Sequence, residues 1–413
     1  MAADAVASDA QTIFAPGAVV FVGPMLAWVG PADRLPGEFA GAERWDLAGL
    51  VVIPAFVNAH THLCLSGLRG AIPPADFPAW VLRLLAWLWS HPDYDRLAAT
   101  KAGIAECLAS GTAALGDVIS VGGMSDGGRV WDTATVLDRS PLGGVAYLEV
   151  LGLGPGATET ARRRLTEEAP ELAGGRLTLG LGPHAPYGTD EAIYRLCVGL
   201  ARKAGWRLMT HVAETREEEE FLRHGTGPLE AVARIGQLAG VRLPVPGCSP
   251  VEYLSRLGFL SPATTLAHLN YPSEHDIDLV AEAGAHVAFC PGSHRFFGHD
   301  PHPVEALLDA GVTVALGTDS LASNESLSML REVRLLRASH PAISAAEALA
   351  MATRNGALAL GIGDRYGALR PGMSASFVAI RPADETLATD PLEAALSEES
   401  SMEVVVIEGR RVA

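Results

Sequence analysis

Short apolar runs that alternate with helical stretches continue from Pro54 to about Leu360, and this repeat limits the fold more than any other feature. Each run ends in polar or Gly residues, and the segment after it carries Ala, Leu, Glu and Arg at helical spacing. Such alternation predicts a parallel sheet, and about eight repeats fit a (β/α)8 TIM-like barrel. A doubly wound open sheet would alternate similarly, but no GxGxxG follows the first strand, so that fold is the weaker alternative. The strand-like runs are residues 112–120, 143–152, 177–188, 207–214, 264–270, 285–293 and 312–320, and helical examples are residues 190–205 and 273–284.

The two ends of the chain have a different pattern. Residues 12–53 and the last segments of the chain alternate apolar and polar residues around Gly and Pro, which predicts short strands joined by turns. We expect the ends to meet in a small flanking β-sandwich domain made of residues 1–53 plus 362–413, with residues 54–361 forming the barrel. The alternative is that each end forms an edge hairpin on the main domain.

Composition excludes several classes of protein. The chain has 413 residues, 48% of them hydrophobic and 19% charged, which is typical of a globular protein. Its formal net charge of -17 argues against a nucleic-acid partner, because phosphate attraction needs a basic face. The five cysteines are widely spaced without a CxxC pair, the N-terminus lacks a signal-peptide pattern, and no apolar segment is long enough to span a bilayer. We therefore expect a soluble, cytoplasmic protein with reduced thiols and no membrane partner.

A pair of histidines follows the first barrel-like strand. In an extended strand, residues two apart point to the same side, so His60 and His62 can aim both imidazoles at one metal ion. Further strand ends carry His211, His268 and Asp319. Because the carboxyl ends of the strands of a barrel converge at one face, we expect these residues to be neighbours.

Each of these residues has a chemical interpretation and a structural alternative. His211 can be the third imidazole ligand, or a hydrogen-bonded structural histidine. Glu214 can move the proton of a water molecule, or it can be a carboxylate that only stabilises the N-terminus of a helix. The Glu217–Glu220 run that follows is expected to be a solvated helix face. Asp319 can complete the ligand set and accept a proton, or cap a helix. His268 can donate a hydrogen bond to the reacting group, or be a satisfied core histidine.

Taken together, HTH at residues 60–62, HVAE at 211–214, LAH at 266–268 and GTDS at 317–320 resemble the amidohydrolase superfamily, in particular its deaminase and chlorohydrolase branch. The resemblance implies a (β/α)8 barrel, a small-molecule substrate and a homodimer. It implies one divalent metal, usually zinc, although the same ligand set also accepts iron or manganese. The implied metal ligands are His60, His62, His211 and Asp319. The implied catalytic residues are Glu214 as proton shuttle, with His268 and Asp319 activating water.

The resemblance also suggests substrate contacts. GPHAPYG at residues 182–188 is similar to a motif of the branch whose histidine, here His184, touches the substrate; the alternative is a loop histidine held by the backbone. Trp80 occupies a position that resembles an aromatic lid, although it could equally be core. The segment 290–303, with Ser293, His294 and Arg295, and the AYLEVLG segment with Glu149 are similar to aminodeoxyfutalosine deaminases of menaquinone biosynthesis.

We therefore expect a metal-dependent deaminase of an adenine-type nucleoside, with 6-amino-6-deoxyfutalosine as the preferred substrate. That nucleoside carries a benzoate at its 5′ end, which Arg295 or His294 could meet. Alternatives within the branch are methylthioadenosine or S-adenosylhomocysteine, guanine and triazines. Against the first two, Pro73 and Pro74 stand about where their deaminases carry a glutamate. A non-catalytic metal-binding barrel is an alternative of another class. A two-metal amidase ranks low because it needs a lysine on a middle strand, and Lys203 lies in a helical stretch.

Overall fold

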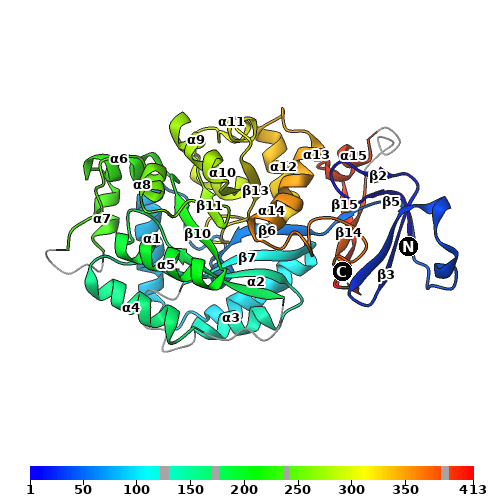
Figure 1. The fold of residues 1–413 in the computed structure, drawn as a ribbon, viewed down its shortest axis with the longest axis horizontal. Coiled ribbons are helices and arrows are strands. Elements are labelled where there is room, and N and C mark those ends of the chain that lie inside the picture. The colour runs from blue at the N-terminus through cyan, green and yellow to red at the C-terminus, as the bar shows by residue number, and fades with distance from the viewer. Residues whose placement is uncertain (121–129, 170–175, 236–240, 383–389) are drawn as a thin grey trace.

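A parallel sheet of eight strands, β6 to β13 in sequence order, forms the centre of the molecule. The computed structural model describes residues 1–120, 130–169, 176–235, 241–382 and 390–413. The amides of Thr318 and Asp319 donate hydrogen bonds to the carbonyl of His60, so the end of the last strand reaches the first strand and the barrel is nearly closed. This architecture confirms the predicted (β/α)8 fold (Figure 1). The strands are β6 (Phe56–Thr61), β7 (Thr112–Ser120), β8 (Gly143–Val150), β9 (Leu177–Pro183), β10 (Arg207–Val212), β11 (Thr264–His268), β12 (His286–Phe289) and β13 (Thr313–Leu316).

The barrel strands are buried along almost their whole length. Every residue of β8 is buried, and so is every residue of β6 and β11. Helices cover the outer side of a (β/α)8 barrel and side chains fill its interior, so its strands are continuous apolar runs that do not alternate with polar residues. Such burial is why the functional side chains lie at the strand ends.

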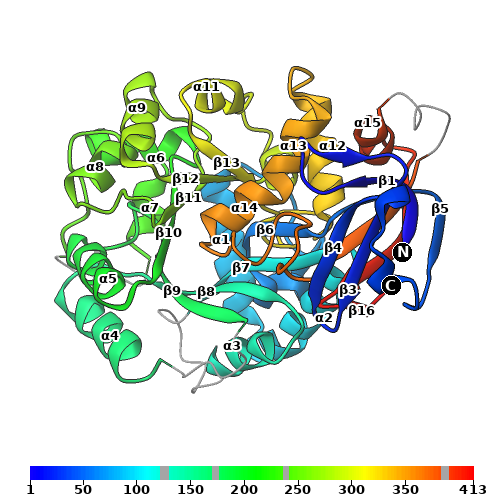
Figure 2. The same cartoon turned by 45° about the vertical axis from the view of Figure 1, so that its right-hand side comes forward.

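Helices follow the strands and cover the outside of the barrel (Figures 1 and 2). In α5 the Asp190 side chain caps the N-terminus and left-handed Gly205 ends the helix, while Ile193, Cys197 and Ala201 form part of its buried face. The helices after β6 to β9 are α1 (Phe77–Ser90), α2 (Arg96–Ala109), α3 (Val130–Asp138), α4 (Pro155–Thr166) and α5 (Glu191–Ala204). Those after β10 to β12 are α6 (Arg216–His224), α7 (Leu229–Ala233), α8 (Pro250–Arg256), α9 (Glu274–Ala283), α10 (Pro291–Phe297) and α11 (Val304–Asp309). After β13 come α12 (Met329–Ser339), α13 (Ala345–Ala352) and α14 (Arg354–Ala359), and α15 (Pro391–Leu396) lies near the C-terminus. The short 3-10 helices are η1 (Ala32–Arg34), η2 (Gly37–Phe39) and η3 (Leu63–Leu68).

Both chain ends contribute to a second sheet beside the barrel, as predicted. Its order is β16-β15-β14-β5-β1-β3-β4, with β2 paired to β1. Strand β5 from the N-terminal part lies between β1 and β14, so the blue and red ends of the chain are side by side (Figure 2). The exact residue boundaries of the two domains remain a prediction. The strands are β1 (Ala2–Ala7), β2 (Ile13–Phe14), β3 (Gly17–Val22), β4 (Met25–Pro31), β5 (Asp46–Pro54), β14 (Phe377–Arg381), β15 (Ser401–Ile407) and β16 (Arg410–Arg411).

The terminal sheet shares part of the hydrophobic core with the barrel. Val51 and Ile53 of β5 and Val378 of β14 belong to the same buried cluster as the barrel strands. All five cysteines are buried, and none of them forms a disulfide. Within the described ranges, no helix combines the length and apolar character that crossing a lipid bilayer requires.

Candidate metal centre

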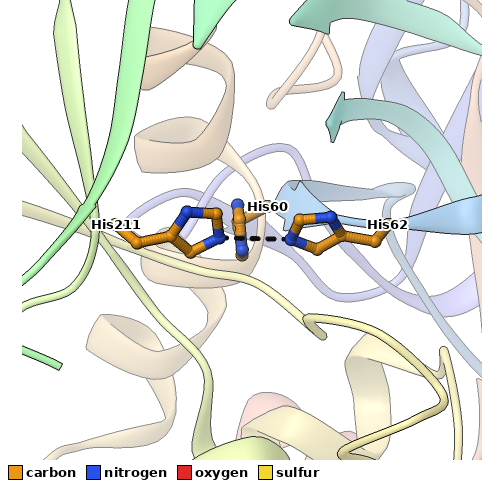
Figure 3. A group of neighbouring side chains, drawn as sticks. All are labelled: His60, His62 and His211. Carbon is orange, nitrogen blue, oxygen red and sulfur yellow. Dashed lines mark hydrogen bonds between the residues drawn. The ribbon is translucent and has the colours of Figure 1, made fainter. Parts of the chain in front are cut away.

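Three imidazoles meet inside the carboxyl end of the barrel. His60 and His62 come from β6 and the residue after it, and His211 comes from β10; their ligating nitrogens lie within 4.8 Å of one another. The Nε2 atoms of His62 and His211 are 3.2 Å apart, and the centroid of the His60 ring lies 4.9 and 5.0 Å from those of the His62 and His211 rings (Figure 3). The spacing of two along a strand therefore has the effect predicted from the sequence, because it turns both rings of the pair inward.

The protonation of these rings suits metal binding. The Nδ1 atom of His211 lies 2.9 Å from the carbonyl of His184, so this nitrogen carries the hydrogen and Nε2 keeps a lone pair towards His62. His60 is fully buried, and no residue within the described ranges forms a hydrogen bond with its Nε2. Burial lowers the pKa of His60, His62 and His211, which keeps the rings neutral. Three neutral imidazoles aimed at one point fit a zinc-like cation.

Asp319 adds an oxygen to this cluster. Its Oδ1 lies 3.7 Å from Nε2 of both His60 and His62. Its Oδ2 accepts hydrogen bonds of 2.7 Å from the hydroxyls of Ser293 and Ser323, which leave Oδ1 free to face the histidines. Burial alone would raise the pKa of Asp319, but His268, His62 and the two hydroxyls lower it overall, so the carboxylate is ionised. The donor set of three nitrogens and one oxygen is one that zinc accepts.

Glu214 and His268 form a second pair beside the cluster. His268 Nε2 lies 3.6 Å from Glu214 Oε1, and both side chains are buried. Burial, the charge of Asp319 and that of Glu218 raise the pKa of Glu214 well above its ordinary value. Burial lowers the pKa of His268 to about 3. A protonated Glu214 and an ionised Asp319 therefore face the same space, which is the division of roles that acid–base chemistry needs.

The strand ends that carry these groups have left-handed backbone. The φ angles are +47° at Ala213, +68° at His268, +50° at Leu269 and +55° at Asp319, a region that non-glycine residues seldom adopt. Hydrogen bonds hold the turns: the amide of Leu269 donates to Val212 O and the amide of Tyr271 to Ala213 O. Such local strain, fixed by the surrounding structure, is common at functional sites.

Side chains behind the pair complete this support. Glu218 accepts a hydrogen bond of 3.0 Å from the amide of Glu214, and the Asn270 side chain donates one of 2.9 Å to the carbonyl of Glu214. His302 Nε2 lies 2.9 Å from the carbonyl of His268. Glu218 is fully buried, so the prediction that the Glu217–Glu220 run is a solvated face was wrong for this residue. The spacing of Glu218, Phe221 and Leu222 on the buried face of α6 is the signal that could have identified it.

The residues predicted to contact substrate lie at different depths. Glu149 and His184 end neighbouring strands and lie next to His211, whereas Trp80 is buried in α1 against Phe297 of α10, with ring centroids 5.1 Å apart. On α10, Ser293 is buried and bonded to Asp319, and His294 Nε2 lies 2.9 Å from the carbonyl of Asp300. Arg295 is exposed and makes no ion pair in the described part of the chain. The substrate contacts remain predictions.

Comparison with known proteins places this geometry in context. The model of the amidohydrolase family matches residues 51–412. An aminodeoxyfutalosine deaminase of Deinococcus radiodurans is 32% identical over 351 residues, which cover 83% of this chain and 80% of the relative. A 5-methylthioadenosine/S-adenosylhomocysteine deaminase of Pelotomaculum thermopropionicum is 30% identical over 362 residues, covering 84% and 76%. The crystal structure of Helicobacter pylori aminofutalosine deaminase with methylthio-coformycin superposes with a TM-score of 0.84 at 22% identity, covering 100% of this chain and 99% of that one, which shows a shared fold.

Proposed function

The chain belongs to the amidohydrolase family, and on that premise we propose that it is a metal-dependent hydrolytic deaminase of adenosine-type nucleosides. The observation that carries the proposal is the convergence of three imidazoles on one point, with Oδ1 of Asp319 3.7 Å from Nε2 of both His60 and His62. The relatives named as nucleoside deaminases support the same class of reaction, the hydrolysis of a C–N bond that is not a peptide bond.

His60, His62, His211 and Asp319 would hold the metal, for which zinc is our first candidate on ligand chemistry. When bound there, a divalent cation lowers the pKa of a water molecule towards neutrality. Asp319 would accept a proton from the attacking water, and its second oxygen is held still by Ser293 and Ser323. His268 donates a hydrogen bond to the attacking oxygen.

Glu214 supplies the proton that the ring needs. As the water oxygen bonds to the ring carbon that bears the amino group, Glu214 protonates the adjacent ring nitrogen. The ionised Glu214 then takes the proton of the added hydroxyl, and Asp319 returns its proton to the amino group. Ammonia leaves as the C–N bond breaks, and both carboxyl groups regain their starting states.

Among adenosine-type nucleosides we propose 6-amino-6-deoxyfutalosine as the substrate. An aminodeoxyfutalosine deaminase is among the relatives, with 32% identity. Arg295, on α10, is exposed and makes no ion pair with the residues that the structure describes. A nucleoside that ends in a benzoate presents a carboxylate, which a guanidinium binds well. Methylthioadenosine and S-adenosylhomocysteine are the second candidates, supported by relatives of that name.

Ammonia release from a panel of substrates tests the proposal. The panel contains 6-amino-6-deoxyfutalosine, methylthioadenosine, S-adenosylhomocysteine, adenosine, guanine and a chlorotriazine, each with the metal-loaded enzyme and with a chelated sample. We expect the adenine nucleosides to be deaminated, 6-amino-6-deoxyfutalosine fastest, and the chelator to abolish turnover. Consumption of the chlorotriazine alone would contradict the substrate class, and a metal-loaded protein inert on the whole panel would favour a non-catalytic barrel.

A further inference from the structure

A buried carboxylate oxygen to which no described residue donates a hydrogen bond lies beside the imidazole cluster. Glu149, at the end of β8, is only 6% exposed, and its Oε1 has no hydrogen-bond partner among the described residues. His184, just after the neighbouring strand β9, has a buried Nδ1 that is equally unpartnered there. A carboxylate oxygen of Glu149, a ring nitrogen of His184 and one of His211 all lie within 4.8 Å of one another.

A buried carboxylate oxygen without a hydrogen bond is costly, and since no described residue supplies one to Glu149 Oε1, a bound molecule is a candidate partner. Removing a polar group from water without a new hydrogen bond costs free energy, and a charged one costs more. Of the residues that line the same hollow, Val118, Pro183 and Met209 offer no side-chain donor. The hydroxyl of Thr210, which also lines it, is bonded to Tyr194 and to the carbonyl of His184. His211, a proposed metal ligand, is among the residues that line this hollow, so a molecule bound at the metal centre would be next to Glu149.

The chemistry of this hollow argues against a second metal ion. His211 uses Nδ1 to donate to the carbonyl of His184, and its remaining lone pair on Nε2 faces His62. Only Glu149 and His184 would then be left as ligands, fewer than a bound zinc ion needs.

A hydroxyl group has the hydrogen-bonding chemistry that these two side chains lack. An oxygen atom between two atoms up to 4.8 Å apart can lie about 2.8 Å from both. It can donate to Glu149 while it accepts from a protonated ring nitrogen of His184, because a hydroxyl is donor and acceptor at once. An amino group has no free acceptor here, and an ether oxygen has no hydrogen to donate.

We propose that Glu149 and His184 together bind one hydroxyl of the sugar of the nucleoside, and so make the enzyme selective for ribonucleosides over deoxynucleosides. This inference rests on the proposed function and deepens it, because it assigns a specificity-determining role to a carboxylate outside the metal ligand set. A site built to hydrogen-bond a hydroxyl discriminates strongly against the analogue that lacks it, since its own polar groups are then left unpaired.

The test combines a substitution in the protein with one in the substrate. Glu149→Met keeps the length of the side chain and removes its charge and its oxygens. It is compared with the wild-type enzyme and with Glu159→Met, a change of an exposed glutamate on α4. Each protein is assayed with an adenine ribonucleoside and with its 2′-deoxy and 3′-deoxy counterparts, and its metal content and thermal midpoint are measured.

We expect the wild-type enzyme and Glu159→Met to favour the ribonucleoside over one deoxy analogue by about 100-fold or more in kcat/KM. Glu149→Met should lose most of that preference, because its kcat/KM falls for the ribonucleoside and not for the deoxy analogues. It should still bind one metal ion per chain, and its thermal midpoint should not fall. Glu149→Gln, which keeps an acceptor oxygen, should recover part of the preference.

Three results would overturn the inference. An equal loss on all three substrates would mean that Glu149 touches no sugar hydroxyl, and loss of metal from Glu149→Met would make it a ligand instead. A wild-type enzyme that deaminates ribo- and deoxynucleosides equally would refute the subsite while leaving the proposed function intact. A wild-type enzyme inactive on every nucleoside would refute the proposed function, and this inference with it.

Discussion

At the scale of single residues, the candidate site separates two carboxyl groups by their surroundings. Asp319 lies among imidazoles and hydroxyls that favour its ionised form, whereas Glu214 is buried next to other acids that favour its neutral form. Neither pKa shift can be predicted from the residue type, because aspartate and glutamate side chains are both ordinary carboxylic acids in water. The pair is therefore where the chemistry can be tested most directly.

Replacing Glu214 by Gln should lower kcat/KM by about 10²–10⁴-fold, because the general acid is lost while the imidazole cluster is unchanged. The pKa of Glu214 is raised, so its protonated, active form persists at neutral pH and is lost as pH rises through that pKa. The wild-type pH profile should accordingly have an alkaline limb that is absent from the residual activity of Glu214→Gln. An unchanged alkaline limb in the variant would assign that ionisation to another group. Metal analysis provides the control, because both proteins should bind one ion per chain.

Glu218 should make the stability of the protein depend on pH. Burial raises the pKa of its carboxyl to about 8 from an unfolded value near 4.5. Between those pH values the folded state therefore binds one more proton than the unfolded state. The contribution of the Glu218 carboxyl to stability is complete below about pH 4.5 and is lost as pH rises through about 8. Denaturant unfolding should show that this loss disappears in Glu218→Gln and remains in the control Glu220→Gln, an exposed position on the same helix. Parallel curves for all three proteins would count against the assignment.

At the scale of elements, two segments far apart in sequence hold one oxygen. Helix α10 brings Ser293 and the loop after β13 brings Ser323, and both hydroxyls donate to Oδ2 of Asp319. Glu332 on α12 fixes this arrangement, since it accepts hydrogen bonds from the amide of Gly292 and from the side chain of Asn324. The orientation of the aspartate is thus a property of three elements and not of its own strand.

Ser293→Ala and Ser323→Ala should each weaken metal binding by about 10-fold or more, because partners of a ligand orient it towards the metal. Each variant should release its metal at a lower chelator concentration than the wild-type protein, and the double variant at a lower one still. Ser339→Ala is the matched control, since that hydroxyl bonds only within its own helix. Chelator titrations that coincide for all five proteins would exclude Asp319 as a ligand held in this way.

The elements also show what the sequence could and could not predict. The strands and the positions of His60, His62 and Asp319 were predictable, because periodicity and a polar residue at a strand end are local signals. The terminal sheet was predictable from its alternating pattern. The partnership of Ser323 with Asp319, the bond between His302 and His268 and the burial of Glu218 were not. These depend on contacts between distant segments, on which a local pattern carries no information.

At the scale of the whole molecule, one acidic side chain joins the terminal sheet to the barrel. Glu408, between β15 and β16, accepts hydrogen bonds from the hydroxyls of Tyr366 and Ser374, at 2.7 and 3.0 Å, and from the guanidinium of Arg365. Its own amide donates to the Ser376 hydroxyl. Arg176, just before β9, lies 3.9 Å from the same carboxylate, so this junction is near the amino ends of the strands and away from the candidate site.

Glu408→Ala should therefore destabilise the protein without lowering its kcat/KM. Removal of the carboxylate leaves two buried hydroxyls without their acceptor, and we expect a loss of about 2–4 kcal/mol in the free energy of unfolding. Because the catalytic groups lie at the opposite ends of the strands, kcat/KM at a temperature where both proteins are folded should stay within about twofold of wild type. Glu403→Ala, whose exposed carboxylate is 3.5 Å from Arg381 in the same sheet, should change stability by less than about 1 kcal/mol. Calorimetry measures the stability and initial rates measure kcat/KM on the same samples. A large loss of kcat/KM in folded Glu408→Ala would mean instead that the terminal sheet controls the geometry of the site.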